Sequence, residues 1–281
     1  MSFKNDFLTR LIVALVAGAF CVGLAWYSDW SLLLVFAFFT IIALWEFFSM
    51  VERGGYKPYK IIGYGIALFF LAVAYHSSLE TYNSIIVFSI LGVFLLKAIQ
   101  SRQSPYKKQL TMILISVFGA IYIGGSLSFA IGLRKMNEMK FQGLTPYDYL
   151  FLVPFAGAWA SDTGAYLTGR LVGKDKLAPT ISEKKTVEGL IGGVVASFCA
   201  TYFFGKMLNL PLSLIVVLGI SLPLLCTAGD LFESSIKRRF EVKDSGTLFK
   251  AHGGVLDRFD GIFFVLPLTY ALIYYFYIYK S

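Results

Sequence analysis

Nine apolar runs separate the polar stretches of this 281-residue chain, and most of them are about as long as a helix must be to cross a bilayer. Inside lipid, every backbone N–H and C=O has to find its partner within the protein, so isolated runs of this kind fold as helices. The composition agrees, since 57% of the residues are hydrophobic and only 15% are charged. We therefore predict an all-α fold, a polytopic integral membrane protein of about nine transmembrane helices, near residues 10–27, 30–51, 61–76, 84–98, 110–133, 147–170, 189–207, 211–236 and 259–279.

The positive charges are divided unevenly between the loops that join these helices. Of the 25 Lys and Arg residues, 20 fall on the side of the N-terminus and 5 on the opposite side. Loops rich in Lys and Arg stay in the cytoplasm, so the N-terminus is predicted to be cytoplasmic and the C-terminus external. We expect a bacterial inner (cytoplasmic) membrane protein whose active site faces the cytoplasm.

The net charge of +8 follows from the same asymmetry and suits the anionic lipids of the inner leaflet. We find no nucleic-acid-binding module, so no nucleic acid partner is expected. The chain divides by chemistry instead. Residues 1–140 are nearly featureless helices, predicted to form a scaffold with access to lipid, whereas residues 141–281 are predicted to be a catalytic region with two cytoplasmic polar loops.

The longest polar stretch runs from Gly229 to Asp260. It begins with residues at spacings of three to four, which places them on one face of a helix, namely Asp230, Ser234, Lys237 and Arg238. The polar loop and turn that follow contain Lys243, His252, Gly253, Gly254, Asp257, Arg258 and Asp260. Carboxylates bind Mg²⁺, Lys and Arg neutralise phosphate oxygens, and bare glycine backbone lets amides approach an anion closely. The stretch therefore indicates chemistry on phosphates.

Plainer interpretations stay open for parts of this stretch. Asp257 is also suited to cap the last helix, with Asp260 favourable in its first turn. Lys237, Arg238 and Arg239 also fit a cluster of positive charge at the membrane interface.

A second polar constellation lies between residues 157 and 193. Asp162 falls inside an apolar run, where an ionisable group is costly and by default marks function, although a hydrogen bond to Ser or Thr in helix packing is the alternative. Lys184, Lys185 and Thr186 precede a predicted helix, where two cations and a hydroxyl suit an anion. A solvated charged loop is the alternative for the two lysines.

The first stretch resembles the signature of the phosphatidate cytidylyltransferases (CDP-diacylglycerol synthases). The matching residues are Ser234-x-Ile236-Lys237-Arg238, then Lys243-Asp244-x-Gly246, then His252-Gly253-Gly254-Val255-x-Asp257-Arg258-x-Asp260. Lys250-Ala251 stands where the family usually has Pro-Gly. The second constellation is similar to the family's other shared region, an Asp-Thr-Gly-Ala-Tyr run followed by Lys-Lys-Thr-x-Glu-Gly. The resemblance covers roughly the C-terminal half, and the N-terminal helices match in hydropathy alone.

The resemblance implies a membrane nucleotidyltransferase that converts CTP and phosphatidate to CDP-diacylglycerol and pyrophosphate in phospholipid biosynthesis, with membrane lipid around it and a homodimer as its assembly. Two polyanions must meet, so Mg²⁺ is the expected cofactor, with the number of metal ions left open. The residues expected to be catalytic are Asp230, Asp257, Lys237 and Arg258. Those expected to hold metal are Asp230 and Asp257, with Asp162 and Asp260 in outer or orienting roles. Those expected to bind substrate are Lys184, Lys185, Thr186, Ser234, Arg238, Lys243, His252, Gly253 and Gly254.

His252 fits a general base, a hydrogen-bond donor to phosphate, or a turn residue. The donor role is favoured, because phosphatidate is already anionic near neutral pH and needs little deprotonation.

Two other functions fit parts of the pattern. A CTP-dependent kinase for polyprenol or another lipid alcohol would need the same metal and phosphate clamps. A transporter would use Asp162 and Asp230 to line an ion path. Against the transporter, the charged residues crowd one side of the membrane.

The charge asymmetry yields a topological prediction. In a variant without the native cysteines, Ser101→Cys is expected to react with a membrane-impermeant thiol reagent only after the membrane is opened, whereas Asn137→Cys is expected to react in intact cells. Equal labelling of the two positions in intact cells would contradict the assignment of nine helices with a cytoplasmic N-terminus.

Overall fold

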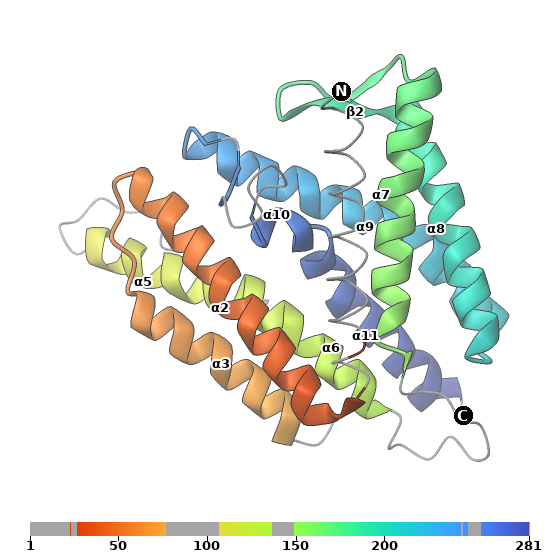
Figure 1. Cartoon of the computed structure of the whole chain (residues 1–281), viewed down its shortest axis with the longest axis horizontal. Coiled ribbons are helices and arrows are strands. Elements are labelled where there is room, and N and C mark those ends of the chain that lie inside the picture. Colours follow the sequence, from red (N-terminus) through yellow and green to blue (C-terminus); the bar gives the residue numbers. More distant parts are fainter. Residues whose placement is uncertain are drawn as a thin grey trace, which may run out of the picture.

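The structure is a computed structural model that describes residues 23, 27–76, 107–136, 149–242, 244–246 and 254–280. The long elements within these ranges are all helices (Figure 1). In chain order the elements are α2 (Asp29–Arg53), α3 (Lys60–His76), α5 (Lys107–Gly119), the π-helical η1 (Ala120–Gly125), α6 (Ser126–Lys135), α7 (Leu152–Val172), β1 (Lys176–Ala178), β2 (Ser182–Thr186), α8 (Val187–Met207), α9 (Leu212–Arg239), α10 (Leu256–Phe259) and α11 (Ile262–Lys280).

The predicted class, a helical integral membrane protein, is confirmed. Within the described ranges, five helical stretches are long and apolar enough to cross a membrane: Asp29–Arg53, Gln109–Lys135, Val187–Met207, Leu212–Arg239 and Leu256–Phe276. Helix α3 is apolar but has only 17 residues. Helix α7 forms where a transmembrane helix was predicted, but its sequence is more polar than those of the five candidate membrane-spanning stretches. The predicted run 84–98 and most of 10–27 lie outside the described residues, so the total of nine stays a prediction.

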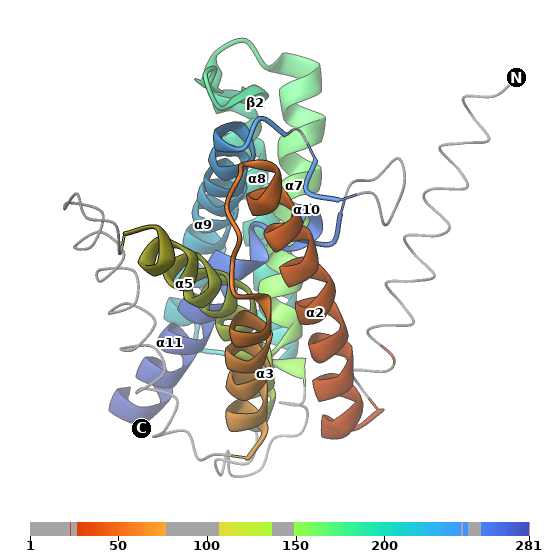
Figure 2. The same cartoon turned by 90° about the vertical axis from the view of Figure 1, so that its left-hand side faces the viewer.

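The N-terminal helices pack as one group, in which α2 and α3 run beside the continuous stretch α5–η1–α6 (Figures 1 and 2). Small residues allow close packing here: a Cβ at Gly124 of η1 would lie 2.5 Å from the Cβ of Ala67 in α3. At the far end of the group, Arg134 of α6 pairs with Asp29 at the start of α2, with 2.5 Å between Nε and Oδ1. The predicted run 110–133 therefore forms one helical stretch that includes a π-helical segment.

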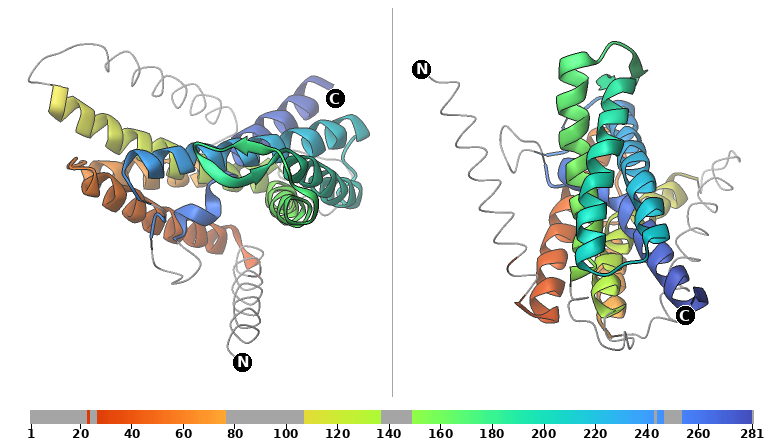
Figure 3. Two further views of the ribbon diagram at one scale, coloured as in Figure 1. Left: turned by 90° about the horizontal axis from the view of Figure 1, so that it is seen from above. Right: turned by 90° about the vertical axis from the view of Figure 1, so that its right-hand side faces the viewer.

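Helices α7, α8 and α9 form a second group, and α7 and α8 lie side by side over their length (Figure 3). Their close approach depends on glycine, because a Cβ at Gly164 would lie 2.6 Å from the carbonyl oxygen of Gly192. Small residues of this kind let helix backbones meet where lipid offers no hydrophobic drive for association. This packing places Asp162 of α7 opposite α9.

Helix α11 packs against both groups, contacting α9 and α7 on one side and α6 on the other. Tyr270, in the middle of α11, is fully buried and its ring lies 5.2 Å from that of Phe129 in α6. The short helix α10 contacts α2 and precedes α11 (Figure 1). The core therefore joins the two groups, and the hairpin before α8 lies at the same end of the bundle as the C-terminal end of α9 (Figure 2).

The polar segment before α8 is a β-hairpin, where sequence analysis predicted a loop. Strands β1 and β2 pair antiparallel, with Lys176 opposite Thr186 and Ala178 opposite Ser182. Thr186 then acts as the N-cap of α8, and its hydroxyl accepts a hydrogen bond from the amide of Gly189 (3.1 Å). Helix α8 accordingly begins two residues before the predicted start at residue 189. The earlier start follows from the strand pairing, because β2 ends at Thr186 and this residue is also the N-cap of α8.

Candidate active site

The two polar constellations meet in the folded chain. The ammonium group of Lys185, at the end of the hairpin, lies 2.6 Å from Oδ2 of Asp230 in α9. The other Asp230 oxygen, Oδ1, accepts a hydrogen bond from the hydroxyl of Ser234, one helical turn further on (3.3 Å). Both side chains of the ion pair keep partial contact with solvent, at 23% and 32% exposure. A cation and a carboxylate that stand far apart in sequence therefore face each other at an accessible position.

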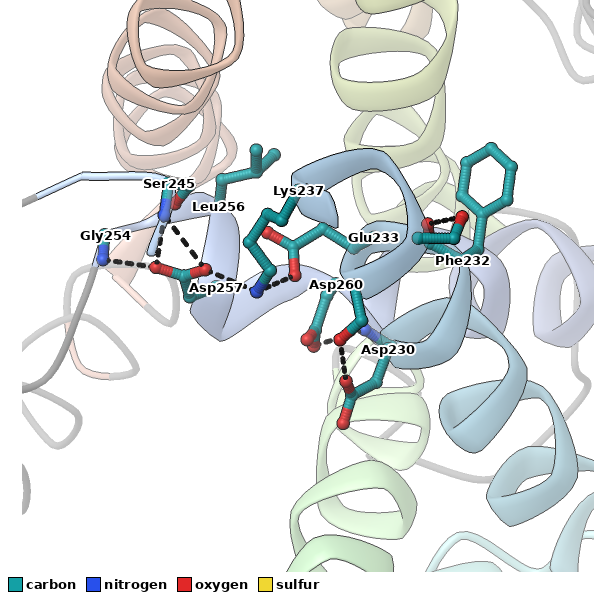
Figure 4. Close-up of polar contacts among 12 residues, drawn as sticks. Asp230, Phe232, Glu233, Lys237, Ser245, Gly254, Leu256, Asp257 and Asp260 are labelled. Atoms are coloured by element: carbon teal, nitrogen blue, oxygen red, sulfur yellow. Dashed lines mark hydrogen bonds and ion pairs between the residues drawn. The ribbon is translucent and has the colours of Figure 1, made fainter. Parts of the chain in front are cut away.

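Two further carboxylates lie near Asp230. Asp162 and Asp260 each experience the negative charge of Asp230, and Asp260 also experiences that of Asp162. Figure 4 shows Asp260 beside Asp230. Asp162 accepts a hydrogen bond from the thiol of Cys226 in α9 (3.5 Å). Among the described residues, no Ser or Thr donates to it, as the packing alternative would require.

Glycine allows the turn between α10 and α11 to approach α9 this closely. A Cβ at Gly229 would lie 2.6 Å from the carbonyl oxygen of Asp260, and one at Gly261 would overlap with the sulfur of Cys226. The turn is held further by the Asp260 carboxylate, which accepts a hydrogen bond from the amide of Gly261 (2.6 Å). Asp260 is thereby placed next to Asp230.

Lys237 lies between two carboxylates (Figure 4). Its ammonium group is 2.5 Å from Oε2 of Glu233, one turn earlier in α9, and 2.8 Å from Oδ1 of Asp257 in α10. Glu233 is only 1% exposed, and its Oε1 has no hydrogen-bond partner among the described residues. Among the described residues, Lys237 supplies the counter-charge of this buried carboxylate, and removing one partner of such a pair is costly.

Asp257 organises the backbone of the polar loop. One oxygen, Oδ2, accepts hydrogen bonds from the amides of Gly254 (2.7 Å) and Ser245 (3.1 Å), while Oδ1 faces Lys237 (Figure 4). Asp257 is not at the start of α11, where the capping alternative put it, but within α10, from which it reaches back to the preceding backbone. Its predicted role as a metal ligand stays a prediction.

A carboxylate from the N-terminal group meets the same loop. Glu46 of α2 is fully buried, and it accepts hydrogen bonds from the amides of Val255 (3.0 Å) and Leu256 (2.8 Å) and from the hydroxyl of Ser245 (3.4 Å). Hydrogen bonds to charged groups contribute about 1.5–3 kcal/mol each. Together they are comparable to the several kcal/mol that desolvating a carboxylate costs.

The remaining predicted residues occupy varied positions. Lys184, Arg238 and Arg258 are exposed, Ser234 is half-buried, and Thr186 and Gly254 are buried. Gly254 was predicted to let its amide approach an anion, and in the structure that anion is the Asp257 carboxylate. Lys243, His252 and Gly253 lie outside the described residues.

Sequence analysis did not identify Glu46, Glu233 or Cys226. A signal existed for Glu46, because it lies in the apolar run 30–51, and an ionisable residue inside a membrane segment is by default functional. Glu233 precedes Lys237 by four residues, a spacing that favours an ion pair on a helix. Nothing in the sequence pointed to Cys226.

The carboxylates suit a hard cation by their chemistry. Among the described residues, no three His, Cys, Asp or Glu side chains stand close enough together to hold a metal ion by themselves. Mg²⁺, however, is commonly bound by one or two carboxylates together with substrate phosphates and water. Asp230 and the neighbouring Asp260 fit that mode.

Comparison with known proteins places the chain in a family. The model of the cytidylyltransferase family matches residues 8–276, which is nearly the whole chain. The chain belongs to the cytidylyltransferase family. The resemblance found in the two polar constellations is thereby confirmed.

Several relatives carry the name phosphatidate cytidylyltransferase. That of Bacillus subtilis is 42% identical over 156 residues, 55% of this chain and 55% of the relative. Those of Staphylococcus saprophyticus and Staphylococcus haemolyticus are 44% and 45% identical over 145 residues, 51% of this chain and 54% of each relative. The chain thus spans about half the length of the curated relatives that it matches.

The buried position of Glu233 makes Lys237 important for stability. We expect Lys237→Met to lower the free energy of unfolding by about 3–5 kcal/mol, because it leaves a buried carboxylate without a counter-charge. Arg238→Met, an exposed neighbour, should change it by about 0.5 kcal/mol or less. Thermal unfolding in detergent measures both. Adding Glu233→Gln to Lys237→Met should recover much of the loss, and equal shifts for the two single variants would contradict this account of the ion pairs.

Proposed function

We propose that the chain is a phosphatidate cytidylyltransferase, which transfers the cytidylyl group of CTP to phosphatidate and releases pyrophosphate. The observation that carries the proposal is the contact between Lys185 and Asp230, in which the two segments that resemble the family's shared regions come together. Membership of the cytidylyltransferase family and the names of the relatives support it. The product would be CDP-diacylglycerol, an intermediate of phospholipid biosynthesis.

In this reaction a phosphate oxygen of phosphatidate attacks the α-phosphorus of CTP. The bond from that phosphorus to the oxygen that bridges it to the β-phosphorus breaks, and pyrophosphate leaves with the electron pair. The attacking group is the lipid phosphate itself, so the protein need not supply a nucleophile. Its task is to bring two polyanions together and to stabilise the charge that develops on the leaving group.

The cations around Asp230 are suited to that task. Lys185 pairs with Asp230, and it can exchange this partner for a phosphate oxygen when CTP is bound. Lys184 and Arg238 are exposed and can contact further phosphate oxygens, and Arg258 is exposed on α10. Lys237, by contrast, is held in place by ion pairs with Glu233 and Asp257. It would stabilise the phosphates from this fixed position.

We further propose that Mg²⁺ binds at Asp230 with Asp260. Asp162, on α7, would orient the metal site or act as an outer ligand. When bound, Mg²⁺ would shield the negative charge of the phosphates. Asp257, predicted from sequence as a ligand, would serve through the loop that it holds, and a direct role for it at the metal remains a separate hypothesis. The charge asymmetry of the loops supports an active site on the cytoplasmic side of the membrane. A homodimer remains an expectation drawn from the family.

The position of a radioactive label tests the reaction directly. Purified protein in detergent, given phosphatidate and CTP, should transfer label to lipid from [α-³²P]CTP and not from [γ-³²P]CTP, and EDTA should abolish the transfer. Asp230→Asn should abolish it too without changing thermal unfolding by more than a few degrees. Lipid labelled from the γ position would identify a kinase instead, and solute flux without nucleotide turnover would identify a transporter.

The two lysines of the hairpin should differ in their effect on CTP. Lys185→Gln is expected to raise the KM for CTP tenfold or more, because a charge-assisted contact contributes about 1.5–3 kcal/mol. Lys184→Gln should raise it less, since Lys184 is exposed while Lys185 is directed at Asp230. Glu183→Gln, on the same strand, is the neutral control. Identical KM values for CTP in all three variants would contradict this role and support the alternative, in which the two lysines only form a solvated charged surface.

A further inference from the structure

The carboxylate of Glu46 attaches the polar loop to the N-terminal helices through hydrogen bonds. This residue lies in α2, within a stretch predicted to be scaffold, and the two residues that follow it in the helix, Phe47 and Phe48, are buried and apolar. Its hydrogen-bond partners in the part of the chain that the structure describes come from the other half of the sequence, and they are Ser245, Val255 and Leu256. A carboxylate so placed would be costly if its only role were packing, because an apolar side chain of similar volume fills such a site equally well or better.

The backbone around Glu46 is shaped to admit it. A Cβ at either Gly246 or Gly254 would overlap with the Glu46 carboxylate, so both positions depend on glycine for this contact. Gly246 and Gly254 stand on either side of the undescribed residues 247–253. Glu46 therefore contacts the backbone segments on both sides of residues 247–253.

Asp257 holds the same two backbone segments from another direction. Its oxygens accept hydrogen bonds from the amides of Ser245 and Gly254, whereas Glu46 binds the Ser245 hydroxyl and the next two amides, those of Val255 and Leu256. The carboxylates of Glu46 and Asp257 thus bind different donors of the same two backbone segments. Because α10 begins with Leu256, any shift of these amides would move the side chains that α10 presents.

The aromatic contacts of α10 are consistent with this attachment. The ring of Phe259 lies 5.0 Å from that of Phe39 in α2 and 6.4 Å from that of Phe155 in α7. These ring contacts pack one face of α10 against α2 and α7. Hydrogen bonds are directional, so those made by the first amides of α10 restrict the rotation of this four-residue helix more than ring packing does. Glu46 supplies those hydrogen bonds.

We propose that Glu46 is a positioning residue for the cytidylyl transfer: it holds the start of α10 so that Asp257, Arg258 and Asp260 stand in register with Asp230 and Lys237 on α9. Glu46 contacts neither substrate, and its effect passes through the backbone of Val255 and Leu256. The catalytic consequence rests on the proposed function, whereas the structural attachment does not.

Hydrogen–deuterium exchange and kinetics on the full chain in detergent test this together. In Glu46→Gln, one carboxylate oxygen becomes an NH₂ group that faces a backbone donor, so the amides of Val255 and Leu256 should exchange at least tenfold faster than in the wild type. The same variant should lose at least tenfold in kcat, with the KM for CTP within about threefold. Glu46→Asp keeps the charge but is shorter by one methylene group. Its exchange rates and its kcat should lie between those of the wild type and those of Glu46→Gln.

Glu52→Gln is the matched control, because Glu52 lies on the same helix and its ion pair with Lys60 is exposed. It should leave both exchange and kcat at wild-type values. Exchange unchanged in Glu46→Gln would overturn the attachment. Faster exchange with unchanged kcat would overturn the positioning role and leave Glu46 purely structural.

A second route is available in case Glu46→Gln does not fold. Gly246→Ala retains the carboxylate but displaces it, and it should reproduce the faster exchange and the lower kcat. Wild-type values in Gly246→Ala would overturn the proposal. A wild-type protein that transfers no label from CTP would refute the proposed function, while the exchange data would still decide whether Glu46 holds α10.

Discussion

A charged group buried among apolar helices has to be paired, and this constraint shapes the polar end of the molecule. Glu46 and Glu233 are both almost completely buried, on α2 and on α9. Glu46 accepts hydrogen bonds from backbone amides, and Glu233 forms an ion pair through Oε2 with Lys237, whose other partner is Asp257. The partners of these two carboxylates belong to the signature stretch, so satisfying the buried charges also fixes the shape of the site.

The same contacts bear on how the chain is divided. Sequence analysis assigned residues 1–140 to a scaffold and residues 141–281 to catalysis. The structure shows that α2 delivers a carboxylate into the loop between α9 and α11, so the N-terminal helices contribute directly to the arrangement of that loop. Breaking the contact would leave both a buried charge and unpaired amides, and the two parts are therefore expected to be energetically coupled.

Glycine has a different role at each end of the site. Gly164 and Gly192 let α7 and α8 approach, and Gly229 lets the turn at Asp260 pack onto α9. At Gly246 and Gly254 the space is occupied by the Glu46 carboxylate instead. The anion that the Gly254 amide meets in the structure belongs to the protein itself, since it is the Asp257 carboxylate, and binding of substrate by Gly254 stays a prediction.

The sequence by itself determined the class of the protein and named candidate residues for the site. Apolar runs fold as helices because lipid leaves the backbone no other partner, and the signature stretch names Asp230, Lys237 and Asp257 through residue type and spacing alone. Only the tertiary structure decided which of them meet. It paired Lys185 with Asp230, placed Asp260 and not Asp257 beside Asp230, and brought Glu46 to the loop. Those contacts join residues far apart in the chain. They depend on how closely helices pack at glycine and on which buried charges find partners, and neither can be read from periodicity along a single segment.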